Sequence, residues 1–503
     1  MPGSHATATA TDITAAHVRP RVALVIGVAA LLVAIVPLPL AAPAHGTLVI
    51  LVTAAGLWMT EALPVAWTAL LIPVLAVLLR VADSRTAFAG FGDPILFLFF
   101  GTFLLTAASF EHGLNARLAH AVLHARLVRQ HPTRLLWAVA LLGCGISAWV
   151  NNTATTVLLL PLALAAEGRA PRPVFVGILL MAAYGPSLGG LATPVGTPPN
   201  LIGLRLLQEG TGMRVSFAHW CALFAPLALL MTFLSAGYFQ MLLRLRPMPT
   251  QEIETARGRG ASQAPATDLP RAGTDAPAAP ARAWSRAEKT LIPVYLLVVA
   301  LWITPGILQA TSWRDAAWFT QWSVRLPETS VPLLGGLALF LLPSGRGRAR
   351  ILDIGVLLRI DWSTLLLFGG GLSLGGLMLE TGLARAIGEF LFGRMPIQGM
   401  TGIVLASALL GILVSEVTSN TASSSLIVPI VIALAQAAGV DPMPPALAAT
   451  VACSFGFMLP VSTPPNALVY ATGRVRIGEM VRYGILLDVV GVLLITAWVR
   501  WFV

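Results

Sequence analysis

The chain has 503 residues, of which 56% are hydrophobic and only 11% are charged. Soluble domains carry about 25% charged residues, so this composition excludes an ordinary soluble globular protein and predicts that lipid surrounds most of the chain. The formal net charge of +10 would suit a nucleic-acid partner. However, the basic residues are spread over loops between apolar runs, which argues against that class.

Long apolar runs recur along the whole chain. They cover residues 22–40, 47–58, 70–79, 135–142, 223–239, 291–302, 331–342 and 485–499. A membrane-spanning helix needs roughly 20 residues, and the pattern predicts about 11 spans, some with blurred ends. The first run is too long for the hydrophobic part of a cleaved signal peptide and is interpreted as a retained span. We therefore predict an all-α polytopic membrane protein.

Two polar segments divide this membrane protein. Residues 1–20 form a polar tail, and residues 246–289 are rich in Pro, Ala, Gly and charge. A segment of that composition cannot bury enough apolar surface to order itself. We predict that 246–289 is a disordered cytoplasmic linker between an N-terminal membrane half (21–245) and a C-terminal membrane half (290–503).

The basic residues also predict the orientation of the chain. When the N-terminal tail is placed in the cytoplasm, most of the 32 Lys and Arg residues fall in cytoplasmic loops. This is the positive-inside distribution of membrane proteins. It predicts a multi-pass protein of the inner (plasma) membrane with a cytoplasmic N-terminus, and it accounts for the net charge without nucleic acid.

Cysteine and histidine give no sign of a cofactor. Cys144, Cys221 and Cys453 lie in or beside apolar segments without metal-like spacing, and we interpret them as small packing residues. His120 and His124 would share one helix face, but no HExxH glutamate lies between them. A wet interfacial helix is the better interpretation of that pair.

Two stretches far apart in the chain are nearly identical. TPVGTPPN at 193–200 and LPVSTPPN at 459–466 agree at six of eight positions. Each follows, at nearly the same distance, a second matched pair, VNNTATT at 150–156 and TSNTASS at 418–424. A duplicated polar signature in so apolar a chain predicts a membrane transporter built from two repeats, with its site where they meet.

A third pair of blocks extends this duplication. LFFGTFLLTAASFEHGL at 98–114 aligns without gaps on LFGGGLSLGGLMLETGL at 367–383. The loop that carries Arg117 is assigned to the inside by the charge distribution, whereas the matching loop that carries Arg385 is assigned to the outside. The two repeats are therefore predicted to be inverted in the membrane.

Polar residues crowd two otherwise apolar segments, near 135–165 and 400–432. The first contains Ser147, Asn151 and Asn152 within a few residues, and unsatisfied polar groups are costly against hydrocarbon. Irregular backbone at membrane depth is tolerated only inside protein or against a wet cavity. We interpret both segments as re-entrant hairpins whose tips carry the NNT and SNT sequences.

The chemistry of these motifs suits small ions. Each Pro-Pro pair blocks helix continuation and frees backbone carbonyls. Hydroxyl, amide and carbonyl oxygens are ligands for a small alkali cation, while helix N-termini favour an anion. Neither motif pair contains Lys or Arg. A bound anion would depend on dipoles and co-bound cations, which favours obligatory cation coupling.

Acidic and glycine-rich positions receive structural interpretations. Glu416 lies inside the second hairpin, and we favour a role in bracing its tip, with direct cation ligation as the second possibility. Glu61 lies between two spans, where a structural cap or salt bridge is favoured over a proton relay. The glycines at 369–371 indicate close helix packing rather than a phosphate loop.

Nearly the whole chain resembles the divalent anion–sodium symporter family, which carries dicarboxylates, citrate or sulfate. The resemblance rests on WMTEALPVAWTALLIP, FGDPILFLFFGTFLL, the two SNT-type tips, GTPPN and FMLPVSTPPNALVYATG. It implies inverted repeats with re-entrant hairpins and broken spans, a homodimer held by scaffold domains, and an elevator motion of the transport domain. The implied function is import of small divalent anions such as succinate, with sodium as the coupling ion.

The resemblance also implies site residues. Sodium ligands, including backbone carbonyls, would be Ser147, Asn151, Asn152 and Gly196 in one site and Ser415, Ser419, Asn420 and Val461 in the other. Substrate contacts would be Asn152, Thr153, Thr197, Pro198, Asn420, Thr421, Thr463 and Pro464.

One residue departs from the family pattern. The first tip is NNT where the family usually has SNT, so Asn151 replaces a serine. The change retains an oxygen ligand but adds bulk and a hydrogen-bond donor. We therefore expect that sodium site, its stoichiometry or the anion preference to differ from the family pattern. An anion exchanger without net sodium coupling remains the nearest alternative, and a polytopic membrane enzyme is a third.

Overall fold

The computed structural model describes residues 18–117, 131–168, 170–245, 283–309, 311–345, 349–394 and 399–503. Within these ranges the regular structure is helical, and the β pairing is limited to a single bridge between Pro343 and Arg350. This confirms the predicted all-α class. Two predicted features, most of the 1–20 tail and the histidine pair His120/His124, lie outside the described residues.

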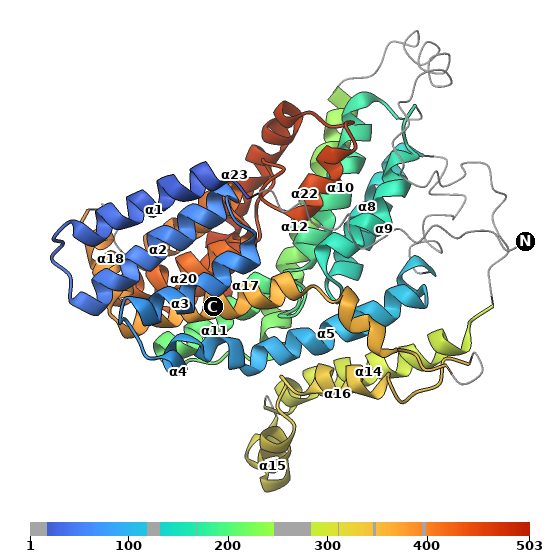
Figure 1. Cartoon of the computed structure of the whole chain (residues 1–503). Coiled ribbons are helices and arrows are strands. Elements are labelled where there is room, and N and C mark those ends of the chain that lie inside the picture. The colour runs from blue at the N-terminus through green and yellow to red at the C-terminus, as the bar shows by residue number, and fades with distance from the viewer. Residues whose placement is uncertain are drawn as a thin grey trace, which may run out of the picture.

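The helices follow one another in two sets, one for each half of the chain (Figure 1). The N-terminal half contains α1 (Pro20–Ile35), α2 (Ala42–Thr60), α3 (Val65–Leu78), α4 (Ser84–Ala87), η1 (Ala89–Gly92), α5 (Pro94–Glu111), α8 (Pro132–Ser147), α9 (Asn152–Leu164), α10 (Arg172–Gly189), α11 (Pro198–Thr211) and α12 (Phe217–Leu245). The C-terminal half contains α14 (Arg286–Gln309), η2 (Ser312–Asp315), α15 (Ala317–Arg325), α16 (Val331–Ala338), η3 (Ile354–Arg359), α17 (Trp362–Glu380), α18 (Leu383–Phe392), α19 (Gly399–Val417), α20 (Asn420–Ala437), α21 (Met443–Ala452), α22 (Pro464–Ala471) and α23 (Ile477–Phe502).

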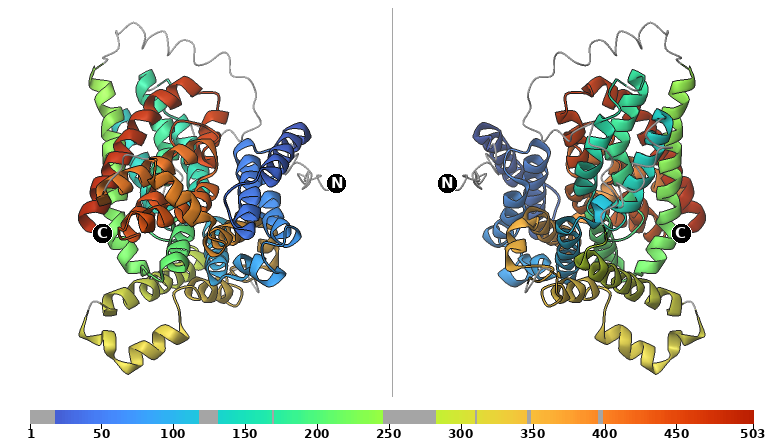
Figure 2. Two further views of the ribbon diagram at one scale, coloured as in Figure 1. Left: turned by 90° about the vertical axis from the view of Figure 1, so that its left-hand side faces the viewer. Right: turned by 90° about the vertical axis from the view of Figure 1, so that its right-hand side faces the viewer.

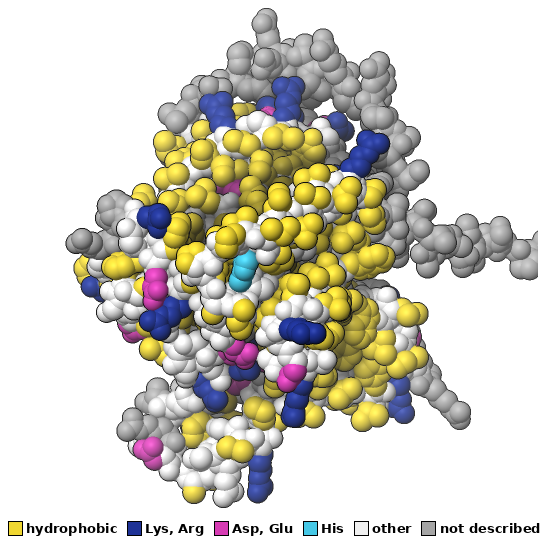
Figure 3. Space-filling view, turned by 60° about the vertical axis from the view of Figure 1, so that its left-hand side comes forward, with side chains coloured by type: hydrophobic (Ala, Val, Ile, Leu, Met, Phe, Trp, Pro, Cys, Tyr) yellow, Lys and Arg dark blue, Asp and Glu magenta, His cyan; other side chains and the backbone are white. Residues whose placement is uncertain are grey.

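Length and composition identify the helices that can cross a membrane. Among the described residues nine helices qualify, namely α2, α5, α10, α12, α14, α17, α19, α20 and α23, and α1, α3, α8, α9 and α21 are shorter apolar helices. Figure 3 shows a face with a broad band of hydrophobic side chains, and with Lys and Arg both at its upper edge and scattered over its lower half. The chain is therefore a polytopic membrane protein, with long and short helices together allowing the predicted number of spans.

The helices pack as two groups. We call α8–α12 with α19–α23 the core group, in which α8 packs along α10 and α19 packs along α21. We call α1–α5 with α14–α18 the frame group, in which α17 packs along α3 and α16 packs along α5. Figure 2 shows α1–α3 on the opposite side of the molecule from α12 and α23. The groups meet mainly where α17 and α18 of the frame contact α20 of the core.

The glycines of α17 allow this close contact. A Cβ atom at Gly370 would lie 2.5 Å from the carbonyl oxygen of Ala69 on α3, and one at Gly371 would collide with the hydroxyl of Ser425 on α20. Small residues let helix backbones approach each other in membranes. The glycine run is thus a packing surface, as the sequence indicated, and it faces both groups at once.

The predicted C-terminal boundary of the linker 246–289 is wrong. Residues 246–282 lie outside the described residues, but α14 begins at Arg286, so the last four residues of the linker are helical. Ser285 and Glu288 form a reciprocal cap, in which each side chain accepts the backbone N–H of the other. Glu288 also pairs with Arg117 at 2.7 Å. This capping box stabilises the first turn of α14.

We predict that Gly370→Ala destabilises the protein by about 1–3 kcal/mol, because the added methyl group must displace the backbone of α3. Gly376 on the same helix is the matched control, since a Cβ there would meet its nearest atom only at 3.8 Å. Gly376→Ala should leave the melting temperature of the purified protein unchanged or slightly higher. Equal melting temperatures for both variants would contradict this account of α17 packing.

Candidate functional site

The first polar tip is a short turn between two helices. Helix α8 ends at Ser147 and α9 begins at Asn152. The buried hydroxyl of Ser147 donates a hydrogen bond of 2.6 Å to the side-chain oxygen of Asn152. Thr193, from the loop that follows α10, donates to the carbonyl of Ala148 within the turn. The tip is thus bonded both across itself and to the neighbouring loop.

The second polar tip repeats this arrangement between α19 and α20. The buried hydroxyl of Ser415 lies 2.8 Å from the side-chain oxygen of Asn420 and 2.6 Å from the carbonyl of Cys453. In return, the hydroxyl of Ser462 donates to the Ser415 carbonyl at 2.7 Å. The residues that sequence comparison paired, Ser147 with Ser415 and Asn152 with Asn420, therefore make the same local hydrogen bond.

The structure explains the departure from SNT in the first tip. The side-chain oxygen of Asn151 caps α9 by accepting the Ala154 N–H at 2.9 Å, and the hydroxyl of Ser419 caps α20 by accepting the Ala422 N–H at 3.3 Å. Asn and Ser are among the best N-cap residues. The substitution therefore preserves the cap and leaves one lone pair of the Asn151 oxygen for a ligand.

Each TPPN motif ends an irregular loop between two core helices. Loop 1 (residues 190–197) joins α10 to α11, and loop 2 (residues 453–463) joins α21 to α22. The proline pair begins the following helix in both cases, at positions where a missing N–H is harmless. Both breaks were predicted from the sequence, and both lie next to the tip of their own half.

The asparagine of each TPPN motif fastens its loop. The amide nitrogen of Asn200 donates to the carbonyls of Gly190 and Thr193, both at 2.9 Å. The amide nitrogen of Asn466 donates to the equivalent carbonyls of loop 2, those of Gly456 and Leu459, at 2.7 and 3.0 Å. We call these two fastenings the asparagine clips. Sequence reasoning missed them, although the repeated Asn was the available signal.

Several oxygens at the breaks remain unpaired. Among the described residues, no donor reaches the buried side-chain oxygens of Asn200 and Asn466. The carbonyls of Gly196 and Val461, predicted as sodium ligands, likewise accept no hydrogen bond there. A buried acceptor without a partner marks a place for a water or an ion. Neutral amide and carbonyl oxygens are suitable ligands for a small alkali cation.

Helix N-termini from both halves accompany these oxygens. Helix α20 packs against α11, and α9 packs against α22. The hydroxyl of Ser424 on α20 also donates to the carbonyl of Pro199 on α11. Thr153 and Thr421 occupy the second position of α9 and α20. Partial positive charge at such helix ends attracts anions, so the arrangement offers anion-binding groups beside cation-binding oxygens.

The threonines before the Pro-Pro pairs differ between the loops. Thr463 caps α22 by accepting the Asn466 N–H at 3.2 Å. Thr197 is buried, but its side chain forms no capping hydrogen bond on α11. The prolines that begin the two helices also differ: Pro198 is half-buried, whereas Pro464 is exposed. Thr197 therefore keeps its hydroxyl available for a ligand.

Glu416, which the sequence suggested would brace the tip of its own hairpin, holds loop 2. Its carboxylate accepts the backbone N–H groups of Met458 and Leu459 at 2.8 and 3.0 Å. The loop is also held from α10, where the hydroxyl of Tyr184 donates to the carbonyl of Phe457 at 2.6 Å. Asp488 on α23 is buried beside Glu416. No pattern in the sequence pairs Asp488 with Glu416.

An aromatic stack ties the first tip to the frame group. Phe217, at the start of α12, stacks on Trp302 of α14 with ring centroids 4.7 Å apart and contacts Trp149 of the tip at 6.4 Å. Glu328 accepts the Phe217 N–H at 3.2 Å. Burial raises the pKa of Glu328 from its ordinary 4.5 to about 7, against the lowering effect of that hydrogen bond.

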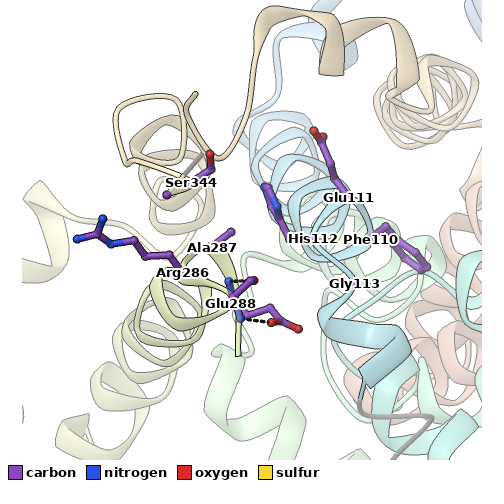
Figure 4. Close-up of a pocket in the computed structure, with 10 residues that line it drawn as sticks. Phe110, Glu111, His112, Gly113, Arg286, Ala287, Glu288 and Ser344 are labelled. Atoms are coloured by element: carbon purple, nitrogen blue, oxygen red, sulfur yellow. Dashed lines mark hydrogen bonds between the residues drawn. The ribbon is translucent and has the colours of Figure 1, made fainter. Parts of the chain in front are cut away.

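Two cavities in the described part of the chain lie away from the tips. One of about 270 Å³ separates the end of α5 from the start of α14, and Figure 4 shows His112 and Glu288 on its two sides. The other, of about 260 Å³, lies beside an ion pair of 2.6 Å between Asp93 and Arg205. Over the described ranges, no three His, Cys, Asp or Glu side chains gather as a metal centre.

An apolar helical bundle with two polar, oxygen-lined breaks is the architecture of a multi-pass membrane transporter. The chain belongs to the citrate transporter family (CitMHS), whose model matches residues 55–452. An uncharacterized transporter of Haemophilus influenzae is 30% identical over 91% of this chain and 92% of that protein. The sodium-dependent dicarboxylate transporter SdcS of Staphylococcus saprophyticus is 30% identical over 87% of this chain and 82% of that protein.

Solved structures confirm the fold class. The YdaH transporter of Alcanivorax borkumensis has a TM-score of 0.56 at 16% identity, covering 91% of this chain and 98% of that one. MtrF of Neisseria gonorrhoeae has a TM-score of 0.57 at 14% identity, covering 94% of this chain and 96% of that one. The family and the curated relatives decide for a transporter over the membrane enzyme considered from the sequence.

We predict that Glu328 makes the stability of the protein depend on pH. Its pKa is raised on folding, so the folded state holds this proton more tightly than the unfolded state. Its stabilising contribution is complete below about pH 4.5 and is lost as the pH rises through about 7. Melting temperatures of the wild type and Glu328→Gln should converge in acid and diverge near pH 7, with the wild type lower. A constant difference would refute the shift.

Proposed function

We propose that this protein imports small divalent anions together with sodium by alternating access. The observation that supports this most is the pair of matching breaks, in which clipped loops leave unpaired oxygens beside helix N-termini. Cation ligands and anion-binding groups of this kind, placed at the meeting of two repeats, are typical of sodium-coupled carriers. The proposed substrates are C4-dicarboxylates such as succinate, with citrate or sulfate as further candidates.

Two sodium sites are proposed, one in each half. Each would combine side-chain oxygens of a tip with backbone carbonyls of the adjacent loop. The first site comprises Ser147, Asn151, Asn152 and Gly196, and the second comprises Ser415, Ser419, Asn420 and Val461. The repeated Ser–Asn hydrogen bonds support this pairing, because both tips present the same oxygens in the same local geometry.

The substrate carboxylates would lie between the two sodium sites. Lys and Arg are absent from both motif pairs, so the anion would be held by amide and hydroxyl donors, helix N-termini and the bound sodium ions. The proposed contacts are Asn152, Thr153, Thr197, Pro198, Asn420, Thr421, Thr463 and Pro464. The name of the related SdcS transporters and the description of the family support a carboxylate substrate.

We further propose that the core group moves as a unit against the frame group. The ion pair between Asp93 of the frame and Arg205 of the core would then break or change partners during transport. The close contact of Gly371 with Ser425 supports a sliding surface, because small side chains offer little obstruction. We also propose that two copies of the chain form a homodimer through their frame groups. The protein would lie in the plasma membrane with its N-terminus in the cytoplasm.

Uptake into proteoliposomes tests the function directly. Labelled succinate, citrate and sulfate are offered with and without an inward sodium gradient. We expect the gradient to accelerate uptake of at least one of these anions. If uptake instead requires unlabelled anion inside the vesicles and ignores the sodium gradient, the protein is an exchanger of the same fold. Sodium-driven uptake into vesicles that contain no internal anion would rule the exchanger out.

We predict that Asn420→Ala damages transport more than Asn151→Ala. Asn420 is expected to serve both cation and anion, whereas the Asn151 oxygen is already engaged as a helix cap. Losing one hydrogen bond to a charged group costs about 1.5–3 kcal/mol, which is roughly one to two decades in affinity. The measurement is the sodium dependence of uptake at matched expression. Asn151→Ser, which keeps a capping oxygen, should remain close to the wild type.

Equal losses of apparent sodium affinity in Asn420→Ala and Asn151→Ala would mean that the two sites are equivalent. That result would contradict the special role given to the Asn151 cap.

A further inference from the structure

We propose that the segment between α14 and α16 lies in the headgroup layer of the membrane, where three tryptophans anchor the adjoining ends of these two frame helices. We call this segment, residues 311–330, the tryptophan lobe. It contains η2 and α15. The inference requires only that the chain spans a membrane, so it is independent of the proposed sodium coupling.

The tryptophan lobe is joined at both ends to helices that face lipid. Ile307, near the end of α14, is 57% exposed, and Leu334, in the first turn of α16, is 55% exposed. Helix α14 is also the least buried of the nine candidate spans among the described residues. Both side chains lie four residues from the lobe, a distance of about 6 Å in a helix. Since each headgroup layer is about 5–8 Å thick, the chain enters and leaves the lobe at headgroup level.

Little of the protein covers the lobe. Figures 1 and 2 show α15 projecting from the bottom of the helical bundle. Helix α15 packs on η2, and η2 packs on α14. Within α15 only Phe319 is buried, and the rings next to it are those of Trp318 and Trp322. The lobe is therefore a small aromatic unit attached to the frame group and left open to its surroundings.

The tryptophans form one exposed aromatic patch. Trp313 is 54% exposed and Trp318 is 49% exposed, and their rings meet edge to face with centroids 5.8 Å apart. Trp322 lies about one helical turn after Trp318 and continues the same side of α15. Thr320 lies about 200° further round the helix from Trp318, on a side whose one large apolar residue is Val324.

The indole N–H groups of this patch donate to no other group in the described part of the chain. By contrast, the indole N–H of Trp302 on α14 donates to the carbonyl of Glu328 at 2.9 Å. Tryptophan combines a large apolar ring with one donor, so it favours the layer where hydrocarbon meets polar groups. Lipid headgroups offer the acceptor oxygens that the protein does not provide here.

The area and charge of the patch favour lipid over a protein partner. The half-exposed indoles of Trp313 and Trp318 offer about 250 Å² together, whereas a stable protein interface buries about 800 Å² on each partner. The lobe contains two Arg and two acidic residues, so its formal charges are balanced. A balanced charge gives no preference for a charged partner, and the anchor should therefore work in neutral as well as anionic membranes.

Spin labels on α15 of the full-length, reconstituted protein test this placement. A nitroxide is attached at Trp318→Cys and, on the opposite side of the helix, at Thr320→Cys, in vesicles of neutral phosphatidylcholine. We expect the label at position 318 to collide more with oxygen, which concentrates in lipid, than with a water-soluble nickel complex. The order should be reversed at position 320. The three native cysteines are buried or half-buried, and the wild type treated in parallel measures their contribution.

Trp313→Cys is the second variant for the patch, with the same expected result, and it decides the matter if Trp318→Cys does not fold. Dominant access to nickel at both 313 and 320 would place the lobe in water and overturn the proposal. Low access to both oxygen and nickel at the patch would indicate a protein partner, such as a second copy of the chain, and overturn it as well. A label that reaches lipid only in anionic vesicles would contradict anchoring by the aromatic rings.

Discussion

The whole site depends on one constraint: backbone polar groups freed by a broken helix must find partners inside a membrane protein, because no water is available in the hydrocarbon. Each Pro-Pro pair stops a helix and creates such groups. The asparagine clips at Asn200 and Asn466 occupy two carbonyls apiece. A small, defined set of oxygens therefore stays unpaired at the breaks. These oxygens are the proposed ligands, so the same hydrogen bonds that stabilise the loops also determine which atoms can bind an ion.

The packing of the helices serves the same constraint. Loops 1 and 2 can be irregular because helices of the other half cover them: α20 lies on α11, and α9 lies on α22. Gly203 of α11 lies so close to Thr450 of α21 that a Cβ there would collide with it. Such approaches require small residues. Each half therefore supplies the protein environment that the break in the other half needs, which explains why the polar motifs occur twice.

Much of this arrangement could be predicted from the sequence. Apolar runs indicated the helices, and duplicated polar tips indicated where they break, because both signals are local. The clips were missed, since the role of Asn200 depends on carbonyls ten and seven residues earlier that only the folded loop brings near. Asp488 was not paired with Glu416, because nothing in the sequence sets the rotation of α23. The start of α14 was missed for a different reason: average composition concealed the capping box at Ser285.

The two halves satisfy the same requirement with different chemistry. Position 148 aligns with 416 and position 193 with 459, following the spacing of the repeated motifs. In the first half, the hydroxyl of Thr193 donates to the carbonyl of Ala148. In the second, the N–H of Leu459 donates to the carboxylate of Glu416. A neutral bond between tip and loop in one repeat has become a bond to a charge in the other. A buried charge needs compensation that a hydroxyl does not, and the two backbone N–H groups of loop 2 that donate to Glu416 provide it.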